Sequence, residues 1–391
     1  MTTKLIENDW EVVSSLEVAD LYIINTCAVT KESEKKSRQY VTKCLKLNPN
    51  AKIVICGCAS QNNAEQFTKN ANVFSVFGNV GKENILNFIN NKNTEIIPFG
   101  ADYGNLGNPT ISTTRAYLKV QDGCNNFCSY CLIPYLRGRS RSRDLTECVA
   151  EANKLALTCK EIVLTGIDLS DYKPSLHQLL NNLRDIPARI RIGSLEVRVV
   201  DKEFLKTLSS MPNFCPQFHL SLQSGDDKVL KRMNRHYTAR EYLSKVKLIR
   251  KYFPNANITT DIIVGFAGET EKQFLNTVKL AKKAKFGKIH VFPYSPREGT
   301  VAYRYEDCDS ATKKARVQYL SNVGAELEQQ FFACNINTIH EVLTEDIEGE
   351  YVVGYTANYI KTYLPLNTPC NQFIQVQLVQ CRNDGMVGKI I

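Results

Sequence analysis

The sequence has no long hydrophobic run and no export signal, and these two absences narrow its class. No apolar stretch approaches the length that crosses a bilayer, so a membrane-spanning protein is excluded. The N-terminus, MTTKLIENDW, is polar and lacks the apolar core of a signal peptide. We therefore expect a cytoplasmic protein with no membrane partner, whose 14 cysteines stay reduced as thiols or metal ligands and form no disulfides. Internal repeats and low-complexity tracts are not evident either.

The composition is that of an ordinary globular protein. A length of 391 residues is enough for two or three domains, and 43% hydrophobic with 23% charged residues is typical of such chains. The 49 lysines and arginines exceed the 40 aspartates and glutamates, which gives a net charge of +9. This excess favours a polyanionic partner without requiring one.

Strand and helix signals alternate along most of the chain, which predicts an α/β fold. In residues 1–98, apolar strands such as LYIINTCAV and KIVICGC alternate with helical segments such as KESEKKSRQYVTKCLKL. This pattern predicts parallel strands with crossover helices in a Rossmann-like domain. The domain begins on a helix, MTTKLIEND, with no strand before it. A stretch rich in Gly, Asn and Pro, FGADYGNLGNPTIST, is predicted to be a linker.

The alternation resumes in residues 110–334, and a different pattern follows in residues 335–391. The strand candidates of the middle segment are AYLKVQ, EIVLTGI, RIRIGSLE, FHLSLQS, ITTDIIVGF and KIHVFPYS. They predict a complete or partial parallel (β/α) barrel with its site at the C-terminal ends of the strands. Short strands split by turns predict a small β-barrel in the last segment. Tyr355, Tyr359, Lys361 and Tyr363 there suit nucleic-acid contact, although aromatic residues in strands more often serve packing.

The most informative motif is the cysteine triad Cys124, Cys128 and Cys131, in the run VQDGCNNFCSYC. Three thiolates at this spacing can ligate three irons of a [4Fe–4S] cluster and leave the fourth iron open to a small molecule. A zinc knuckle and three unrelated cysteines are the alternatives. Zinc sites normally take four Cys or His ligands, and no histidine lies nearby to complete one. The basic run RGRSRSR follows the triad, and this position favours phosphate contact over a merely solvated loop.

Longer segments surround this motif in a fixed order: DGCNNFCSYCLIPYLRGRSRSR, LTGIDLSDY, IGSLE, HLSLQSGDDKVLKRMNRHYT, TTDIIVGFAGETEKQF and HVFPYSPREGTVA. With INTCAVTKESEKKSRQ and ICGCASQ before them and GYTANYIK after them, they resemble the radical S-adenosylmethionine methylthiotransferase family. The resemblance covers essentially the whole chain. It implies a methylthiotransferase domain, a radical S-adenosylmethionine core as a partial (β/α) barrel, and a C-terminal TRAM domain, which is a small RNA-binding β-barrel.

The resemblance also implies a reaction. SLQSG, HVFPYSPREGT and SEKKSRQ are similar to the branch that modifies threonylcarbamoyladenosine in tRNA. The implied activity is transfer of a methylthio group to C2 of N6-threonylcarbamoyladenosine at tRNA position 37, with an electron donor like flavodoxin or ferredoxin. One alternative is the branch that modifies isopentenyladenosine. Another is a radical enzyme or RNA-binding remnant that has lost sulfur transfer.

The family's cofactor contacts carry over to particular residues of this sequence. Cys124, Cys128 and Cys131 match the ligands of the radical cluster, to whose open iron S-adenosylmethionine binds. Tyr130, between the last two cysteines, matches a position beside the adenine of that cofactor. Gly166 and Glu196, at strand ends, are further expected cofactor contacts. For Glu196 the competing interpretation is a buried carboxylate paired with a basic residue for structural reasons.

A second [4Fe–4S] cluster is implied, with three cysteine ligands from the N-terminal segment. Cys27 in NTCAVT and Cys58 in CGCAS match two of them. The third belongs to an LGC-x-x-N motif that the chain lacks, and the first strand of the domain is missing with it. Either the reading frame extends upstream of Met1, or the shortened chain is real. In the second case the chain lacks the second cluster or binds it through other ligands. Alternation along a strand places Cys56 on the same face as Cys58, but Cys56 and Cys44 do not match the family pattern.

The other cysteines lack cluster spacing and are expected to be small buried apolar residues. They are Cys148, Cys159, Cys215, Cys308, Cys334, Cys370 and Cys381. His219 and His236 lie near the expected barrel mouth, where a satisfied core or loop histidine is a better interpretation than a metal ligand.

Overall fold

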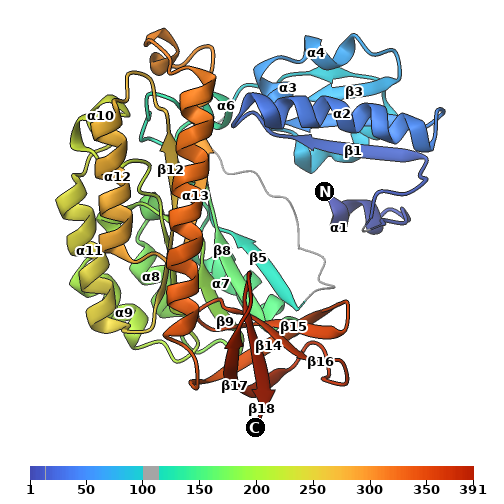
Figure 1. Cartoon of the computed structure of the whole chain (residues 1–391). Helices are drawn as coiled ribbons and strands as arrows, with labels where there is room; N and C mark the ends of the chain where they lie inside the picture. The colour runs from blue at the N-terminus through green and yellow to red at the C-terminus, as the bar shows by residue number, and fades with distance from the viewer. Residues whose placement is uncertain (14, 100–113) are drawn as a thin grey trace. The chain divides into compact units, whose positions relative to one another are not determined.

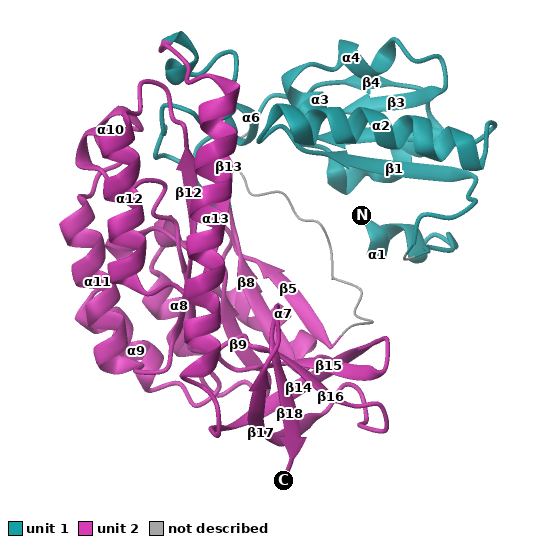
Figure 2. Ribbon diagram, in the orientation of Figure 1, with its two compact units in different colours: residues 1–110, 122–141, 295–304 teal, residues 111–121, 142–294, 305–391 magenta. Residues whose placement is uncertain are grey.

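The computed structural model describes the whole chain except residues 14 and 100–113. The predicted linker falls almost entirely on residues outside the described part. The chain divides into two compact units (Figure 2), of which the first comprises residues 1–110, 122–141 and 295–304 and the second comprises residues 111–121, 142–294 and 305–391. The cysteine loop therefore belongs to the same unit as the N-terminal segment. The three domain boundaries expected from the sequence stay a prediction.

The first unit is built on a parallel sheet with the strand order β1-β2-β3-β4 (Figure 1). Its strands are β1 (Leu21–Thr26), β2 (Lys52–Gly57), β3 (Val73–Phe77) and β4 (Thr94–Glu95). Its helices are α1 (Thr2–Ile6), α2 (Lys31–Leu47), α3 (Cys58–Asn62), α4 (Glu65–Thr68), η1 (Lys82–Asn84), α5 (Ile85–Asn90), α6 (Ile133–Arg137) and η4 (Val301–Arg304). The alternation predicted from the sequence, including the initial helix, is confirmed.

Both faces of this sheet are covered, which explains why β2 is apolar along its length. Ile53 and Ile55 point into a core on the side of α2, whereas Val54 and Cys56 point into a second core on the side of α5. Successive strand residues point to opposite faces, so a parallel strand between two helical layers needs an apolar residue at every position. Thr30 caps the start of α2, and its side chain accepts a hydrogen bond from the backbone N–H of Ser33 at 3.0 Å.

In the described part of the second unit, the parallel strands form two neighbouring sheets in the orders β5-β8-β9 and β10-β11-β12-β13. The strands are β5 (Arg115–Lys119), β8 (Glu161–Thr165), β9 (Arg189–Ile192), β10 (Ser194–Leu195), β11 (Gln217–Leu220), β12 (Asn257–Val264) and β13 (Lys288–Pro293). The short strands β6 (Gln121–Asp122) and β7 (Arg141–Ser142) pair with each other. The predicted partial (β/α) barrel is confirmed, as a barrel made of two sheets.

Helices connect these strands and cover their outer side (Figure 1). They are α7 (Leu145–Ala156), η2 (Leu169–Asp171), α8 (Leu176–Leu183), η3 (Val197–Val199), α9 (Lys202–Ser209), α10 (Asp227–Arg232), α11 (Ala239–Tyr252), α12 (Glu271–Ala284) and α13 (Ser310–Ala333). Thr238 and Thr270 start α11 and α12 with reciprocal capping boxes, in which the side chain of the third helical residue bonds back to the cap. One continuous apolar core joins the inner faces of the helices to the strands.

The last segment forms a closed barrel with the strand order β14-β15-β16-β18-β17. The strands are β14 (Ile339–Glu348), β15 (Tyr351–Thr356), β16 (Lys361–Pro365), β17 (Phe373–Cys381) and β18 (Met386–Ile390). This barrel contacts the starts of the central strands, because Arg115 at the beginning of β5 pairs with Glu345 at 2.5 Å. Arg189 at the beginning of β9 pairs with Glu341 at 2.9 Å. The C-terminal barrel therefore lies at the N-terminal ends of the central strands.

Candidate active site

The cysteine triad lies on a tight loop between β6 and α6. Gly123 has a φ of 74°, and a Cβ atom there would lie 2.0 Å from the carbonyl oxygen of Arg139. Only glycine fits this position. Phe127 has a φ of 45°, in the left-handed region that residues with a side chain rarely adopt. The surrounding contacts thus hold the loop in a conformation that an isolated peptide would avoid.

The three thiols of this loop are half-buried, and none is in a disulfide. The backbone N–H of Asn126 donates to Sγ of Cys124 at 3.4 Å, and that of Ile133 donates to Sγ of Cys131 at 3.5 Å. Hydrogen bonds to cysteine sulfurs tune iron–sulfur clusters. The loop therefore fits a [4Fe–4S] cluster with three cysteine ligands, although the assignment of each ligand stays a prediction. Tyr130 is half-buried in the same loop, and its contact with a cofactor likewise stays a prediction.

Within the first unit, the cysteine loop packs on the N-terminal segment. Leu132 and Leu136, from the end of the loop and from α6, are buried in the same apolar core as Ile53 and Ile55 of β2. The guanidinium of Arg137 reaches Cys58, with 3.4 Å between Nε and Sγ, and also pairs with Asp122 at 3.1 Å. Burial lowers the pKa of Arg137, but the charges of Cys58 and Asp122 outweigh burial and raise it. Arg137 thus places a positive charge and an N–H donor beside the sulfur of Cys58.

The strand register brings Cys27 and Cys58 to the same edge of the sheet. Thr26 of β1 pairs with Gly57 of β2, so the two cysteines follow directly after paired residues. The Thr26 hydroxyl accepts hydrogen bonds from the backbone N–H groups of Ala59 and Ser60, at 3.1 and 3.2 Å, and thereby fixes the turn that carries Cys58.

A side-chain amide also reaches Cys58. The Nδ2 of Asn79 donates to Sγ of Cys58 at 3.4 Å and to the backbone oxygen of Leu136 in α6 at 2.9 Å. Asn79 was not singled out from the sequence, and its only signal was its place after β3, at the same edge of the sheet. The two thiols and their donors fit a metal–sulfur group, and the role of Cys27 and Cys58 as ligands stays a prediction.

The prediction that Cys56 shares a face with Cys58 is wrong. Cys56 is the fifth residue of β2 and points into the core beside α5, whereas Cys58 is already the first residue of α3 and lies in the core beside α2. The chain turns at Gly57, whose φ is 106°, so strand alternation does not extend past it. Burial raises the pKa of the Cys56 thiol to about 11. Cys44 is buried on α2.

In the second unit, Gly166 and Glu196 follow the C-terminal ends of β8 and β10. A Cβ atom on Gly166 would lie 2.9 Å from Oε1 of Gln121, which accepts hydrogen bonds from the backbone N–H groups of Ile167 and Asp168. The missing side chain thus lets the loop after β8 close on a buried amide. Gly166 and Glu196 are brought near each other, because Oγ of Ser170 in this loop accepts a hydrogen bond from the backbone N–H of Glu196 at 2.8 Å.

The side chain of Glu196 is buried and ion-paired. It contacts Arg198 at 2.6 Å and Arg235 at 3.6 Å. This pairing agrees with the alternative interpretation, in which Glu196 is a buried carboxylate with a structural role. Contact of Glu196 or Gly166 with a cofactor stays a prediction.

The basic run after the triad is mostly engaged inside the protein. Arg137 contacts Cys58, and Arg143 pairs with Glu147 at 3.3 Å and with Glu151. Arg141 lies over the ring of Phe99, with 5.7 Å between guanidinium carbon and ring centre. Arg139 is the exposed member, over the ring of Phe127. These contacts do not fit phosphate binding by the whole run. The sequence could not show this, because the spacing of charges does not reveal which arginines are paired inside the protein.

The tyrosines of the C-terminal barrel contact neighbouring side chains, although Tyr359 is 37% exposed. The rings of Tyr355 and Tyr359 stack with their centres 4.6 Å apart, and the guanidinium of Arg115 lies over both. Tyr363 is buried and donates to Asp384 at 2.8 Å. This arrangement matches the packing alternative, and nucleic-acid contact by these residues stays a prediction.

The prediction that the remaining cysteines are buried is only partly right. Cys148, Cys159 and Cys215 are buried, but Cys334 and Cys370 are exposed, and Cys308 and Cys381 are half-buried. Cys334 directly follows the last residue of α13, and Cys370 lies in the turn before β17. Residues at the ends of helices and in turns are often exposed to solvent. No helix among the described residues is long and apolar enough to cross a membrane.

Comparison with known proteins identifies the family of this chain. Residues 118–281 match the family described as "Radical SAM superfamily", and residues 1–78 match "Uncharacterized protein family UPF0004". Among solved structures, a radical S-adenosylmethionine methyltransferase, TsrM, from Kitasatospora setae matches with a TM-score of 0.54 at 15% identity. That match covers 71% of this chain and 64% of the other, and it shows a shared fold.

Curated relatives match along most of the chain. "Threonylcarbamoyladenosine tRNA methylthiotransferase MtaB" of Bacillus subtilis is 37% identical, over 88% of this chain and 82% of the relative. The protein of the same name from Chlamydia pneumoniae is 34% identical, over 97% of this chain and 91% of the relative. A "tRNA-2-methylthio-N(6)-dimethylallyladenosine synthase" of Natranaerobius thermophilus is 37% identical, over 86% of this chain and 80% of the relative. The chain belongs to the radical S-adenosylmethionine methylthiotransferase family.

Proposed function

We propose that this protein is a tRNA methylthiotransferase that adds a methylthio group to C2 of N6-threonylcarbamoyladenosine at tRNA position 37. The cysteine loop carries the proposal, because three half-buried thiols, two of them with backbone N–H donors, fit the cluster on which the family depends. Relatives named for this reaction are 33–37% identical over 86–97% of the chain. A relative from the dimethylallyladenosine branch reaches 37% identity as well, so the substrate must be tested directly.

In this proposal Cys124, Cys128 and Cys131 hold a [4Fe–4S] cluster, and Tyr130, Gly166 and Glu196 contact S-adenosylmethionine. When bound, the cluster and this cofactor supply the radical that removes a hydrogen atom from the substrate. The chain itself shapes the loop through Gly123 and supplies N–H donors to the sulfurs.

Cys27 and Cys58 are proposed to bind a second cluster, which supplies the sulfur. Arg137 and Asn79 donate hydrogen bonds to the sulfur of Cys58 and orient it. The loop helix α6 carries Arg137 and accepts the bond from Asn79, so the proposed sites are linked through one short helix. Because the described residues place two cysteines here, we expect this cluster to be bound less firmly than the first.

The proposed partners follow from the substrate. tRNA is a polyanion, which agrees with the net charge of +9. A cytoplasmic location is part of the proposal, and a tRNA substrate agrees with it. An electron donor of the flavodoxin or ferredoxin kind is needed to reduce the radical cluster.

The deciding experiment expresses the chain in a strain that lacks the threonylcarbamoyladenosine methylthiotransferase and identifies tRNA nucleosides by mass spectrometry. We expect the 2-methylthio derivative of threonylcarbamoyladenosine, and its loss in the variant Cys128→Ala. The exposed Cys334→Ala is the matched control and should keep activity.

Other products would select the alternatives. A methylthio group on isopentenyladenosine would assign the chain to the other tRNA branch. Release of 5′-deoxyadenosine in vitro without any methylthio nucleoside would show a radical enzyme that has lost sulfur transfer.

A further inference from the structure

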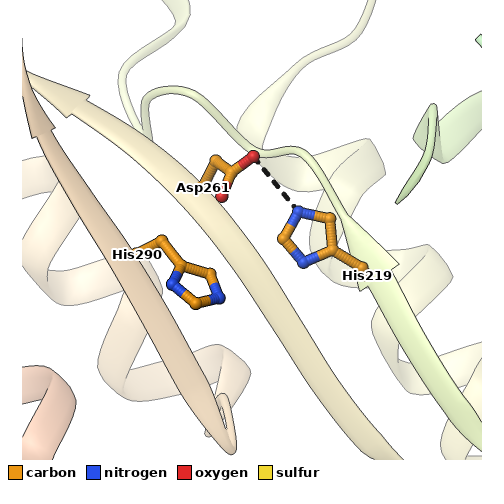
Figure 3. A group of neighbouring side chains, drawn as sticks. All are labelled: His219, Asp261 and His290. Atoms are coloured by element: carbon orange, nitrogen blue, oxygen red, sulfur yellow. Dashed lines mark ion pairs between the residues drawn. The ribbon is translucent and has the colours of Figure 1, made fainter. Parts of the chain in front are cut away.

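Two histidines and an aspartate converge on the inner side of the second sheet of the central barrel (Figure 3). The nitrogen and oxygen atoms that His219, Asp261 and His290 can offer to a metal lie within 4.8 Å of one another. They come from the neighbouring strands β11, β12 and β13. His219 Nε2 lies 3.1 Å from Oδ2 of Asp261. Two imidazoles and a carboxylate form a ligand set typical of divalent transition metals.

The strand register explains why these side chains meet. Asp261 pairs with His290 across β12 and β13, and His219 pairs with Thr259, two residues before Asp261. Paired residues of parallel strands, and residues two apart on one strand, point to the same face. Their meeting is therefore fixed by the sheet backbone and does not depend on loops.

Second-layer contacts prepare the histidines for a metal. Nδ1 of His219 is 2.9 Å from Oγ1 of Thr259, which fixes the ring and directs Nε2 towards Asp261. Metal-binding histidines usually engage their other ring nitrogen in this way. His290 on β13 is the exposed member of the three, so a metal ion can reach its imidazole from solvent.

The three residues border a cavity of about 600 Å³ that also reaches the C-terminal barrel. Its cationic side chains are already neutralised, because Lys288 pairs with Glu328 at 3.0 Å and Lys361 with Asp384 at 3.1 Å. Arg191 pairs with Glu161 at 2.8 Å. These pairs reduce the repulsion that a bound cation would meet.

The same cavity has a further polar side chain in its lining. Asn257 borders it and is 5% exposed, and its Oδ1 has no hydrogen-bond partner among the described residues. It lies on β12 at the face shared by Thr259 and Asp261. Buried acceptors are normally satisfied by protein, water or ligand. This oxygen therefore belongs to the polar lining of the cavity, four residues along β12 from Asp261.

We propose that His219, Asp261 and His290 bind a divalent transition-metal ion, separate from the cysteine sites. Three protein ligands leave coordination positions for water or for an anionic ligand in the cavity. This site does not rest on the proposed tRNA reaction, and it gives His219 a role other than the satisfied core histidine expected from the sequence.

Manganese is a suitable probe, because Mn²⁺ prefers carboxylate and imidazole over the thiolates of the 14 cysteines. The full-length, cluster-loaded protein is passed over chelating resin and titrated with Mn²⁺, and free Mn²⁺ is followed by electron paramagnetic resonance. We expect one Mn²⁺ bound per chain with micromolar affinity. The variants Asp261→Asn and His290→Gln should bind it at least about tenfold more weakly, and Thr259→Val about 10–100-fold more weakly through loss of ring orientation.

The exposed His236→Gln is the matched control and should bind like the unaltered protein. Circular dichroism and iron content verify that each variant is folded and retains its clusters. Failure of the unaltered protein to bind Mn²⁺ at millimolar concentration would overturn the proposal. Unchanged binding by folded Asp261→Asn and His290→Gln proteins would overturn it as well, since the metal would then lie elsewhere.

Discussion

A single missing methyl group allows the cysteine loop to form. Gly123 and Gly268 both have positive φ angles, 74° and 70°, so alanine is disfavoured at either by about 1–2 kcal/mol. They differ in space, because a Cβ on Gly123 would meet the Arg139 carbonyl oxygen at 2.0 Å, whereas one on Gly268 would meet nothing within 4 Å. We expect Gly123→Ala to lose most of its iron after anaerobic reconstitution, and Gly268→Ala to keep it. Equal iron contents would show that the loop tolerates the clash.

The contact between Arg137 and Cys58 makes a second prediction at this scale. The variant Arg137→Gln removes the positive charge and the donor at Sγ of Cys58, so iron bound through Cys27 and Cys58 should fall. Release of 5′-deoxyadenosine should be reduced less than methylthio transfer, because the triad keeps its own backbone donors. Arg38→Gln, at an exposed arginine on α2 in the same unit, is the control. An unchanged ratio of the two products in Arg137→Gln would contradict this role.

Individual residues also show how far sequence reasoning reaches. The spacing of Cys124, Cys128 and Cys131 is local, so it could be recognised before any fold was known. The partner of Arg137 could not be recognised in this way, because Cys58 is 79 positions away and nothing in RGRSRSR distinguishes this arginine from the others. The same holds for His219, whose neighbours Asp261 and His290 become visible only through strand register.

At the scale of elements, the starts of β5, β8 and β9 are joined by a buried ion-pair network. Glu161 is fully buried and contacts Arg115 at 2.6 Å and Arg191 at 2.8 Å. Burial alone would raise the pKa of Glu161, but its hydrogen bonds and charge interactions with Arg191 and Arg115 lower it to about 2. Arg115 in turn pairs with Glu345 of the C-terminal barrel, so the network ties the two barrels together.

This depressed pKa predicts a pH dependence of stability. The unfolded carboxyl titrates near 4.5, so the stabilisation is complete above that pH and is lost as the pH falls towards 2. The difference corresponds to about 3 kcal/mol. In urea unfolding between about pH 6 and pH 3, Glu161→Gln should be less stable at the upper pH and should lack this part of the acid loss. Glu147→Gln, at an exposed ion pair, should follow the unaltered protein. Parallel pH profiles for Glu161→Gln and the unaltered protein would refute the assignment.

The elements themselves were largely predictable, and their joining was not. Hydrophobic alternation located the strands and helices of both α/β segments, but RIRIGSLE, expected as one strand, is divided into β9 and β10 at Gly193. The backbone N–H of Gly193 bonds to the carbonyl oxygen of Leu164 at 2.9 Å, and a Cβ there would lie 2.9 Å from the same oxygen. The chain thus passes from one sheet to the next at a residue with no side chain. The hydrophobic periodicity of a segment shows which of its residues are buried, but it does not show which strand pairs with it.

For the whole molecule, the sequence indicated three segments in order, whereas packing groups residues 122–141 and 295–304 with the N-terminal segment. Arg297 of the last of these pieces pairs with Glu34 of α2 at 2.5 Å, across 263 positions of sequence. Such contacts follow from tertiary packing, and composition or spacing along the chain cannot reveal them.

The net charge of +9 belongs to the whole molecule, and it predicts how binding to tRNA responds to salt. Each phosphate neutralised by a basic side chain releases counterions, so the logarithm of affinity should fall with the logarithm of salt concentration by about 0.7–0.9 per contact. Arg139 is the exposed arginine of the basic run, and we expect Arg139→Gln to reduce this slope by about 1. Lys154→Gln removes the same charge from an exposed position on α7 and should leave the slope nearly unchanged. Fluorescence titration of labelled tRNA at several salt concentrations measures both. Equal slopes for the two variants would mean that net charge alone attracts the tRNA and that Arg139 makes no phosphate contact.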